Sequence, residues 1–350
     1  MPRTTTLESH LQEDPPRGAA EGVGSVLLEL AAGVRAIAAV LARAVVCGAV
    51  AGIAGDGEPR TRMEGLANDL LVDACTPGGQ VSAVVSPELE EPHPVFGRQA
   101  APFLLAMTPL DGASNLCVNV TAGTIFSVLR RPAGAAPGAA AFLQEGARQV
   151  AAGYALYGPC TMLVVTTGRD VLGFTLDEGA GAFVLTHPDL RVPEQAGHVA
   201  VEAASARNFD RAIRRYVDEC VAGASGPRGA DFDVRWVGSA AAEVHRVLVR
   251  GGTFLAPRDA SDPERRAKLR LLYEASPLAL LVERAGGAAT TGSGRLLEVV
   301  PRDPHERVPA VLGSRAEVER IAAYHADPDG GVDRPYKSPL FNVRSLLRET

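Results

Sequence analysis

The chain has 350 residues, of which 46% are hydrophobic, and its formal net charge at pH 7 is −6. This length allows two domains or one large bilobed unit with a substantial core. The acidic balance gives no electrostatic reason to expect nucleic acid or an anionic membrane as a partner. Five scattered cysteines without a C-x-x-C pair argue against a disulfide framework or a zinc cluster. The first twenty residues are polar and carry no secretory signal, so we expect a cytoplasmic protein.

Helices and then short strands are predicted along the N-terminal half. Residues 1–22 have the composition of a flexible arm, and apolar residues at helical spacing predict a helix from Val26 to about Val50. Three charged residues interrupt this apolar stretch, so we expect a buried helix of a soluble protein and not a membrane span. A shorter helix is predicted over residues 63–74, and a helical stretch within residues 141–157. Short apolar runs predict strands at 81–85, 103–107, 125–129, 162–167, 171–175 and 182–185.

The second half of the chain alternates between helices and strands, which is typical of an α/β lobe. We expect the boundary near residue 196, so that residues 23–196 form one lobe, 197–335 a second lobe and 336–350 a tail. Helices are predicted near 209–221, 240–250, 277–285 and 316–325, with a strand at 253–255.

Several carboxylates fall at the ends of predicted elements, where the sites of layered α/β proteins usually lie. Asp111 follows an apolar strand and precedes a turn of small residues, whose backbone N–H groups are suited to cradling a phosphate. Glu274 lies in an apolar run and therefore needs a polar partner. Oxygen-rich acid clusters suit Mg²⁺. The other acids of this kind are Glu58, Glu64 and Glu88, and the turn consists of Gly112, Ala113, Ser114 and Asn115.

Longer motifs carry a family resemblance over nearly the whole chain. They include residues 68–70, 109–112, 123–130, 151–158, 237–239, 244–246, 268–274, 285–292 and 338–341. With these motifs the chain resembles class I fructose-1,6-bisphosphatases, especially the bacterial type associated with the Calvin cycle. The resemblance implies a layered α-β-α-β-α sugar-phosphatase fold with two lobes. It also implies a homodimer or homotetramer in which Arg235 reaches across a subunit boundary.

The expected metal site departs from the family pattern at two positions. Pro87 stands where the resemblance places a metal-binding Glu, and Thr108 stands where it places an Asp that bridges two metals. Two-metal catalysis needs anions that hold two divalent ions about 4 Å apart. The expected metal ligands are therefore Asp111, Glu274 and Glu58, and we expect them to bind Mg²⁺ weakly or not at all.

The expected phosphate-binding end of the pocket departs from the pattern too. The resemblance places Glu202 where the family has Asn, and Trp236 where it has Tyr. A carboxylate beside a phosphate lowers the affinity for that phosphate. Ser205 and Ala256 stand at further tyrosine positions, whereas Arg235 and Lys268 match the family.

The favoured interpretation is an enzyme repurposed to act on a different small molecule. In this interpretation the acid/base groups are Asp111, Glu88, Glu64 and Glu202. Two alternatives stay open. One is a residual Mg²⁺-dependent phosphatase that converts fructose 1,6-bisphosphate to fructose 6-phosphate, and the other is a non-catalytic paralogue with a binding or regulatory role. The expected substrate-binding residues are Gly112, Ala113, Ser114, Asn115, Arg235, Trp236, Ala256 and Lys268.

Overall fold

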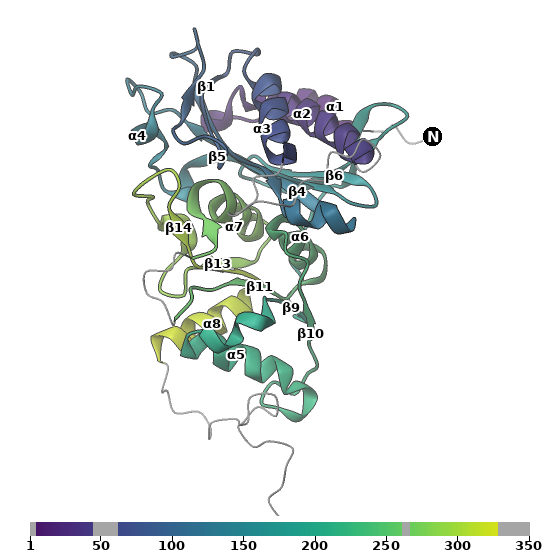
Figure 1. The fold of residues 1–350 in the computed structure, drawn as a ribbon, viewed down its shortest axis with the longest axis vertical. Helices are drawn as coiled ribbons and strands as arrows, with labels where there is room; N and C mark the ends of the chain where they lie inside the picture. The colour runs from purple at the N-terminus through teal and green to yellow at the C-terminus, as the bar shows by residue number, and fades with distance from the viewer. Residues whose placement is uncertain (1–4, 45–61, 261–266, 328–350) are drawn as a thin grey trace, which may run out of the picture.

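The computed structural model describes residues 5–44, 62–260 and 267–327. These residues stack in five layers, in the order helices, large sheet, helices, small sheet and helices (Figure 1). The predicted layered α-β-α-β-α architecture is therefore confirmed.

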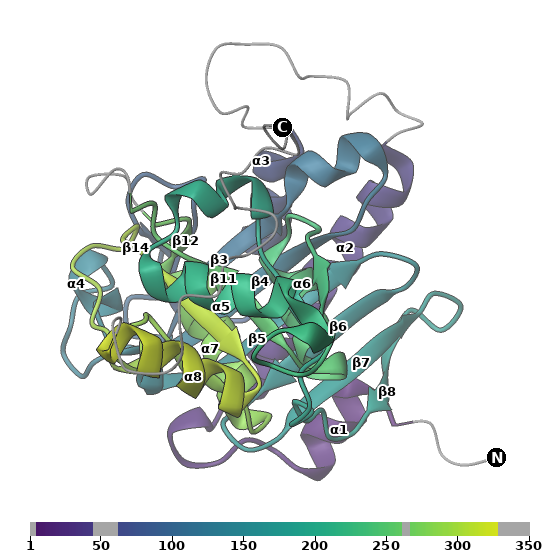
Figure 2. The same cartoon turned by 90° about the horizontal axis from the view of Figure 1, so that it is seen from below.

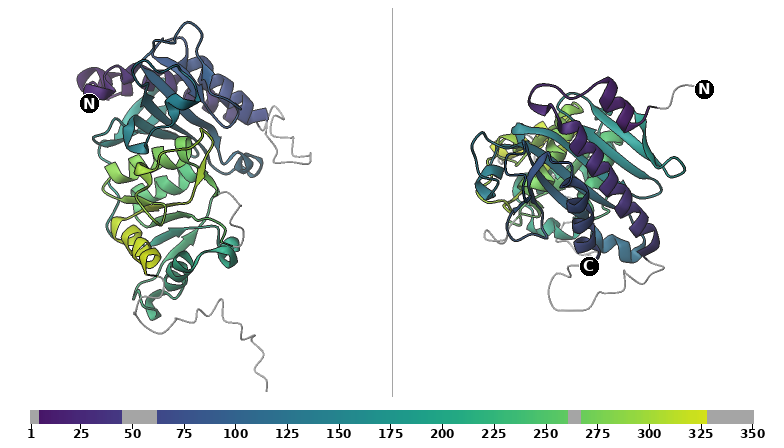
Figure 3. Two further views of the ribbon diagram at one scale, coloured as in Figure 1. Left: turned by 90° about the vertical axis from the view of Figure 1, so that its left-hand side faces the viewer. Right: turned by 90° about the horizontal axis from the view of Figure 1, so that it is seen from above.

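The first helical layer covers the outer face of the large sheet. It contains α1 (Leu7–Glu13), α2 (Val23–Ala44) and α3 (Arg62–Cys75). By length and composition alone α2 could cross a membrane, with a mean hydropathy of 1.9 over Val23–Arg43. However, α2 lies across the large sheet beside α3, and one face of it is buried in their shared core (Figure 3). The packing therefore supports the prediction of a buried helix, whose predicted last six residues lie outside the described part of the chain.

The prediction of a loose arm over residues 1–22 is wrong for the segment that forms α1. Thr6 and Ser9 form a capping box, in which each side chain accepts a hydrogen bond from the backbone N–H of the other. The backbone of Leu185 also donates to the carbonyl of Thr5 over 2.8 Å. Local capping and this link to the large sheet hold the segment in place.

The large sheet has eight strands in the order β2-β1-β3-β4-β5-β6-β7-β8. β1 and β3 are parallel, and the other neighbours are antiparallel. Helices cover both faces, so side chains from β4 enter two cores: Phe126 packs toward α2 and α3, and Ile125 packs toward the middle helices. The strands are β1 (Val81–Val85), β2 (His93–Pro94), β3 (Phe103–Asp111), β4 (Ala122–Arg130), β5 (Gln149–Tyr157), β6 (Thr161–Thr166), β7 (Val171–Asp177) and β8 (Ala182–His187).

The helical stretch predicted within residues 141–157 is wrong for most of its length. Helical structure is confined to the four-residue helix α4 (Ala139–Phe142) and the 3₁₀ turn η3 (Gly146–Arg148), and residues 149–157 form the buried strand β5. An added Cβ at Gly153 would lie 2.3 Å from the ring of Phe126. Gly153 lets β5 pair closely with β4 and β6, and this pairing overrides the helix propensity of the alanines.

The middle layer consists of α6 (Ala240–Arg250) and α7 (Ser276–Arg284), which fill the space between the two sheets. α5 (Arg211–Val221) and α8 (Arg315–Ala326) lie side by side on the outer face of the small sheet (Figure 2). All four helices agree with the predictions to within two residues at each end.

The small sheet has the strand order β10-β9-β11-β15-β13. Its strands are β9 (His198–Ala200), β10 (Asp233–Arg235), β11 (Thr253–Ala256), β13 (Ala288–Thr290) and β15 (Ala310–Gly313). A separate ribbon pairs β12 (Leu269–Arg270) with β14 (Arg307–Val308).

Candidate active site

Asp111 ends β3 and lies at the interface between the large sheet and the middle helices. The pairing of β3 with β4 shifts register between Thr108 and Asp111, which redirects the last residues of the strand. The next residue, Gly112, has φ +74°, and an added Cβ there would lie 2.8 Å from Cβ of Ser239. Glycine is therefore required at this turn for both its backbone conformation and its small size.

The Asp111 carboxylate is held at the N-terminus of α6. Its Oδ2 accepts hydrogen bonds from the hydroxyl of Ser239 over 2.6 Å and from the backbone N–H of Ala241 over 2.9 Å. Burial raises the pKa of Asp111, and these hydrogen bonds partly offset that rise. Ser239 is also the N-cap of α6, because its hydroxyl accepts from the N–H of Ala242.

Glu274 faces the same region from a π-helical turn, η6 (Leu271–Ala275), which follows β12. Its Oε2 accepts from the backbone N–H of Arg270 over 2.7 Å, and the hydroxyl of Thr108 donates to Oε1 over 3.3 Å. Burial raises the pKa of Glu274 to about 7, and the nearby negative charge of Asp111 adds to the rise. The polar partner expected for this acid is thus Arg270, and the structure brings Asp111 and Glu274 together.

The turn after Asp111 is tied to the loop that precedes α6. The side-chain amide of Asn115 donates to the carbonyls of Thr121 (2.8 Å) and Val237 (2.9 Å). The buried carboxylate of Glu243 accepts from the N–H of Val237 and pairs with Arg246 over 2.7 Å. The amide of Asn115 therefore positions backbone, whereas a substrate contact for this residue stays a prediction.

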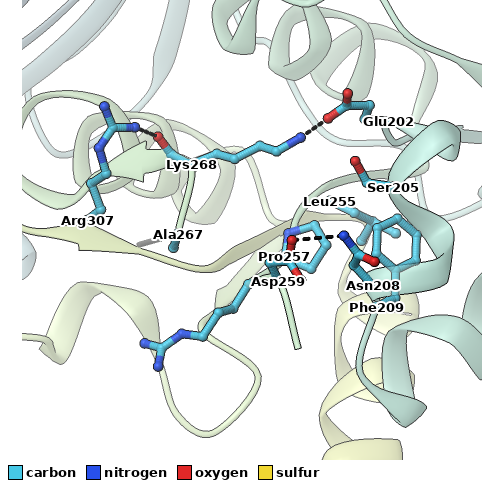
Figure 4. Close-up of a pocket in the computed structure, with 11 residues that line it drawn as sticks. Glu202, Ser205, Asn208, Phe209, Leu255, Pro257, Asp259, Ala267, Lys268 and Arg307 are labelled. Carbon is cyan, nitrogen blue, oxygen red and sulfur yellow. Dashed lines mark hydrogen bonds and ion pairs between the residues drawn. The ribbon is translucent and has the colours of Figure 1, made fainter. Parts of the chain in front are cut away.

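A cavity of about 530 Å³ lies beside the end of β11 (Figure 4). Its lining residue Lys268 comes two positions before Arg270, whose backbone N–H binds Glu274. Inside it, the ammonium of Lys268 forms an ion pair with the carboxylate of Glu202, and Arg307 donates to the carbonyl of Lys268. Arg307 lines the cavity, and its positive charge also lowers the pKa of Glu274. The other lining residues are Ser205, Asn208, Phe209, Leu255, Pro257, Arg258, Asp259 and Ala267.

The remaining residues expected at the phosphate-binding end differ in their burial and in their contacts. Trp236 stacks on Phe254 with ring centroids 6.3 Å apart, and the ammonium of Lys268 lies 5.9 Å from the Trp236 ring. Ala256 is buried in the core between the two sheets and does not line the cavity. Arg235 is exposed on β10 and pairs with Asp233 over 3.3 Å.

Comparison with known proteins shows the family. The family model described as "Fructose-1-6-bisphosphatase, N-terminal domain" matches residues 5–188, and the one described as "Fructose-1-6-bisphosphatase, C-terminal domain" matches residues 192–326. The chain belongs to the fructose-1,6-bisphosphatase family.

Alignments with bacterial proteins and with a solved structure span most of the chain. A "Fructose-1,6-bisphosphatase class 1" from Hydrogenophilus thermoluteolus is 45% identical, over 99% of this chain and 98% of that protein. A "Fructose-1,6-bisphosphatase class 1 3" from Methylibium petroleiphilum is 47% identical, over 88% of each chain. The crystal structure of Leishmania major fructose-1,6-bisphosphatase in its holo form is 32% identical with a TM-score of 0.85, and covers 93% of this chain and 100% of that one.

The other expected metal or acid/base residues come from other parts of the chain. Glu64 lies half-buried on α3, and Glu88 lies half-buried just after β1. Glu58 lies outside the described residues. Across the described part of the chain, no three carboxylate, histidine or cysteine side chains form a group that could hold a metal ion.

Two residues that shape the site were missed by reasoning from the sequence. Ser239 carried a usable signal, because a serine directly before an apolar helix is a typical N-cap. Arg307 carried none, because it meets Lys268 only through the pairing of β12 with β14, 39 positions away.

Proposed function

We propose that the chain is a phosphatase that removes a phosphate group from a sugar phosphate, with fructose 1,6-bisphosphate as the first substrate to test. The observation that carries this proposal is the convergence of Asp111 and Glu274 close to a cavity whose lining includes Lys268 and Arg307. The names and identities of the bacterial relatives support it. We expect phosphate hydrolysis to be slower than in an enzyme that keeps all of the expected metal-binding acids.

The oxygen donors at the site fit one magnesium ion better than two. Mg²⁺ is commonly bound through one or two carboxylates together with substrate phosphate. We propose Asp111 and Glu274 as these carboxylates, with Glu58 as a further ligand. A bound ion would polarise a phosphoryl oxygen as a Lewis acid. The neutral hydroxyl of Thr108 offers no charge to offset the repulsion between two divalent ions, so the described residues do not fit a two-metal cluster.

The remaining assignments form part of the same proposal. The N–H groups of Gly112, Ala113 and Ser114 would bind the phosphate that is removed, and Lys268 with Trp236 would contact the far end of the substrate. Arg235 would reach into a partner subunit of a homodimer or homotetramer, because it is exposed on an edge strand. We propose a cytoplasmic location. Acid/base roles for Glu64 and Glu88 stay predictions from the sequence.

A second candidate is action on a small molecule other than fructose 1,6-bisphosphate. The ion pair between Glu202 and Lys268 favours it, because a carboxylate in the cavity disfavours a second phosphate there. A non-catalytic role is the third possibility, and no specific contact favours it.

Phosphate release from fructose 1,6-bisphosphate and a panel of sugar monophosphates tests these candidates. The assay uses the full chain with Mg²⁺ or Mn²⁺, and with EDTA as the metal-free control. We expect slow, metal-dependent release that Asp111→Asn abolishes and that Asp170→Asn, a change in an exposed acid paired with Arg191, leaves intact. Release that survives Asp111→Asn, or no release from any sugar phosphate, would reject the phosphatase proposal.

A further inference from the structure

We infer that Glu202 is a specificity-determining residue, which makes the cavity select substrates whose far end is uncharged. The inference rests on the proposed phosphatase function and names the class of substrate: a sugar monophosphate in preference to a bisphosphate. Figure 4 shows Glu202 and Lys268 reaching toward each other across the cavity from two different elements.

The ion pair removes the most direct anchor for a second phosphate. The side chains of Glu202 and Lys268 are 39% and 48% exposed, so the pair lies at the accessible surface of the cavity. A phosphate that approaches the ammonium of Lys268 must displace the carboxylate of Glu202 or lie next to it. Either arrangement weakens binding, because like charges repel and the existing pair is lost.

A second carboxylate adds to this effect. Asp259 also lines the cavity and accepts a hydrogen bond from Asn208 over 2.9 Å. The lining thus contains two carboxylates and three cationic side chains, those of Arg258, Lys268 and Arg307. The charged side chains of the lining therefore leave one net positive charge, and Arg307 also donates to the Lys268 carbonyl.

An uncharged, hydroxyl-bearing end of a sugar suits the groups that remain. The hydroxyl of Ser205 offers a donor and an acceptor, and the side-chain oxygen at position 202, in Glu or in Gln, accepts from sugar hydroxyls. The Trp236 ring lies near Lys268 and supplies an apolar face. These contacts recognise a hydroxymethyl group without requiring a second negative charge.

Binding can be measured without turnover, because Trp236 is the only tryptophan in the chain. Its fluorescence is titrated with fructose 6-phosphate and with fructose, and calorimetry gives an independent dissociation constant. We expect Glu202→Gln to tighten binding of fructose 6-phosphate at least tenfold and to leave fructose within twofold. Glu319→Gln, which removes the same charge from the exposed face of α8, should change neither constant.

The higher affinity of Glu202→Gln for fructose 6-phosphate must depend on Lys268. Adding Lys268→Met to Glu202→Gln should return the affinity for fructose 6-phosphate to that of the unchanged protein. In the hydrolysis assay, Glu202→Gln should raise kcat/KM for fructose 1,6-bisphosphate relative to fructose 1-phosphate at least tenfold. Unchanged affinity in Glu202→Gln, or a gain that persists without Lys268, would overturn the inference. A binding shift without hydrolysis of either substrate would support the role of Glu202 and reject the phosphatase proposal alone.

Discussion

The hydroxyl of Ser239 donates a 2.6 Å hydrogen bond to the carboxylate of Asp111, although 128 positions separate the two residues. The same serine caps α6, so one side chain links the end of β3 to the start of a middle-layer helix. This link fixes the direction of the acid on which the proposed chemistry depends.

Ser239→Ala should therefore affect both stability and activity. Loss of the cap and of a charge-assisted hydrogen bond should lower the free energy of unfolding by about 1–3 kcal/mol. Phosphate release should fall as Asp111 loses its fixed orientation. Urea unfolding and the phosphate-release assay measure the two effects. Ser225→Ala, which removes only an exposed hydrogen bond to Ala222, is the control, and equal behaviour of the two variants would contradict the proposed role of Ser239.

Gly112→Ala should destabilise the protein more than the same substitution at another glycine with a positive φ. The positive φ alone costs about 1–2 kcal/mol for a residue with a Cβ, and contact with Ser239 adds a steric term. Gly134 is a matched control, because its φ is +75° and an added Cβ there meets nothing within 4 Å. Urea unfolding should show a clearly larger loss for Gly112→Ala. Similar losses for the two variants would show that the turn accommodates the methyl group.

Thr108→Asp should make the protein more dependent on magnesium. Without metal, a new buried carboxylate beside Glu274 should lower the melting temperature by several degrees. Mg²⁺ should reverse this loss and raise phosphate release about tenfold or more, because the third acid holds the ion more tightly. Thr108→Asn supplies a similar volume without the charge. If Mg²⁺ changes the melting temperature and phosphate release equally in both variants, Asp111 and Glu274 do not form the metal site.

His245 should make stability depend on pH between about 4 and 6.5. Burial lowers the pKa of His245 to about 4, and its Nδ1 lies 2.8 Å from the hydroxyl of Tyr154. In this window the unfolded state binds a proton that the folded state does not, so stability is retained above pH 6.5 and falls as the pH decreases. At pH 5 the loss should be on the order of 1–2 kcal/mol.

Comparing urea unfolding at pH 7.5 and pH 5 in His245→Gln and in the unchanged protein measures this contribution. The variant should lose less stability on acidification, after correction for its own starting value. His93→Gln, a change at an exposed histidine of β2, is the control. An identical pH dependence in all three proteins would show that His245 does not carry the effect.

Local sequence patterns were enough to predict most helices and strands and to single out the two central acids. The apolar spacing of α3 and α6 and the short β-type runs of β1 and β3 predicted their positions, because a face buried in one core imposes a regular period on the sequence. Asp111 stood out at a strand end beside a glycine turn, and Glu274 stood out as an acid in an apolar run. Motifs along the chain were sufficient to identify the family.

Tertiary structure decided what local patterns could not express. β5 pairs with both β4 and β6, and the ring of Phe126 leaves no room for a Cβ at Gly153, although the alanines of this segment favour a helix. The contacts of Ser239 with Asp111 and of Glu202 with Lys268 join distant segments, and their strength depends on burial and distance, which are properties of the folded chain. The fold and the family could be read from residue patterns and motifs, because these are local properties of the chain. The charge balance of the cavity could not, because it depends on residues that meet only when the layers pack together.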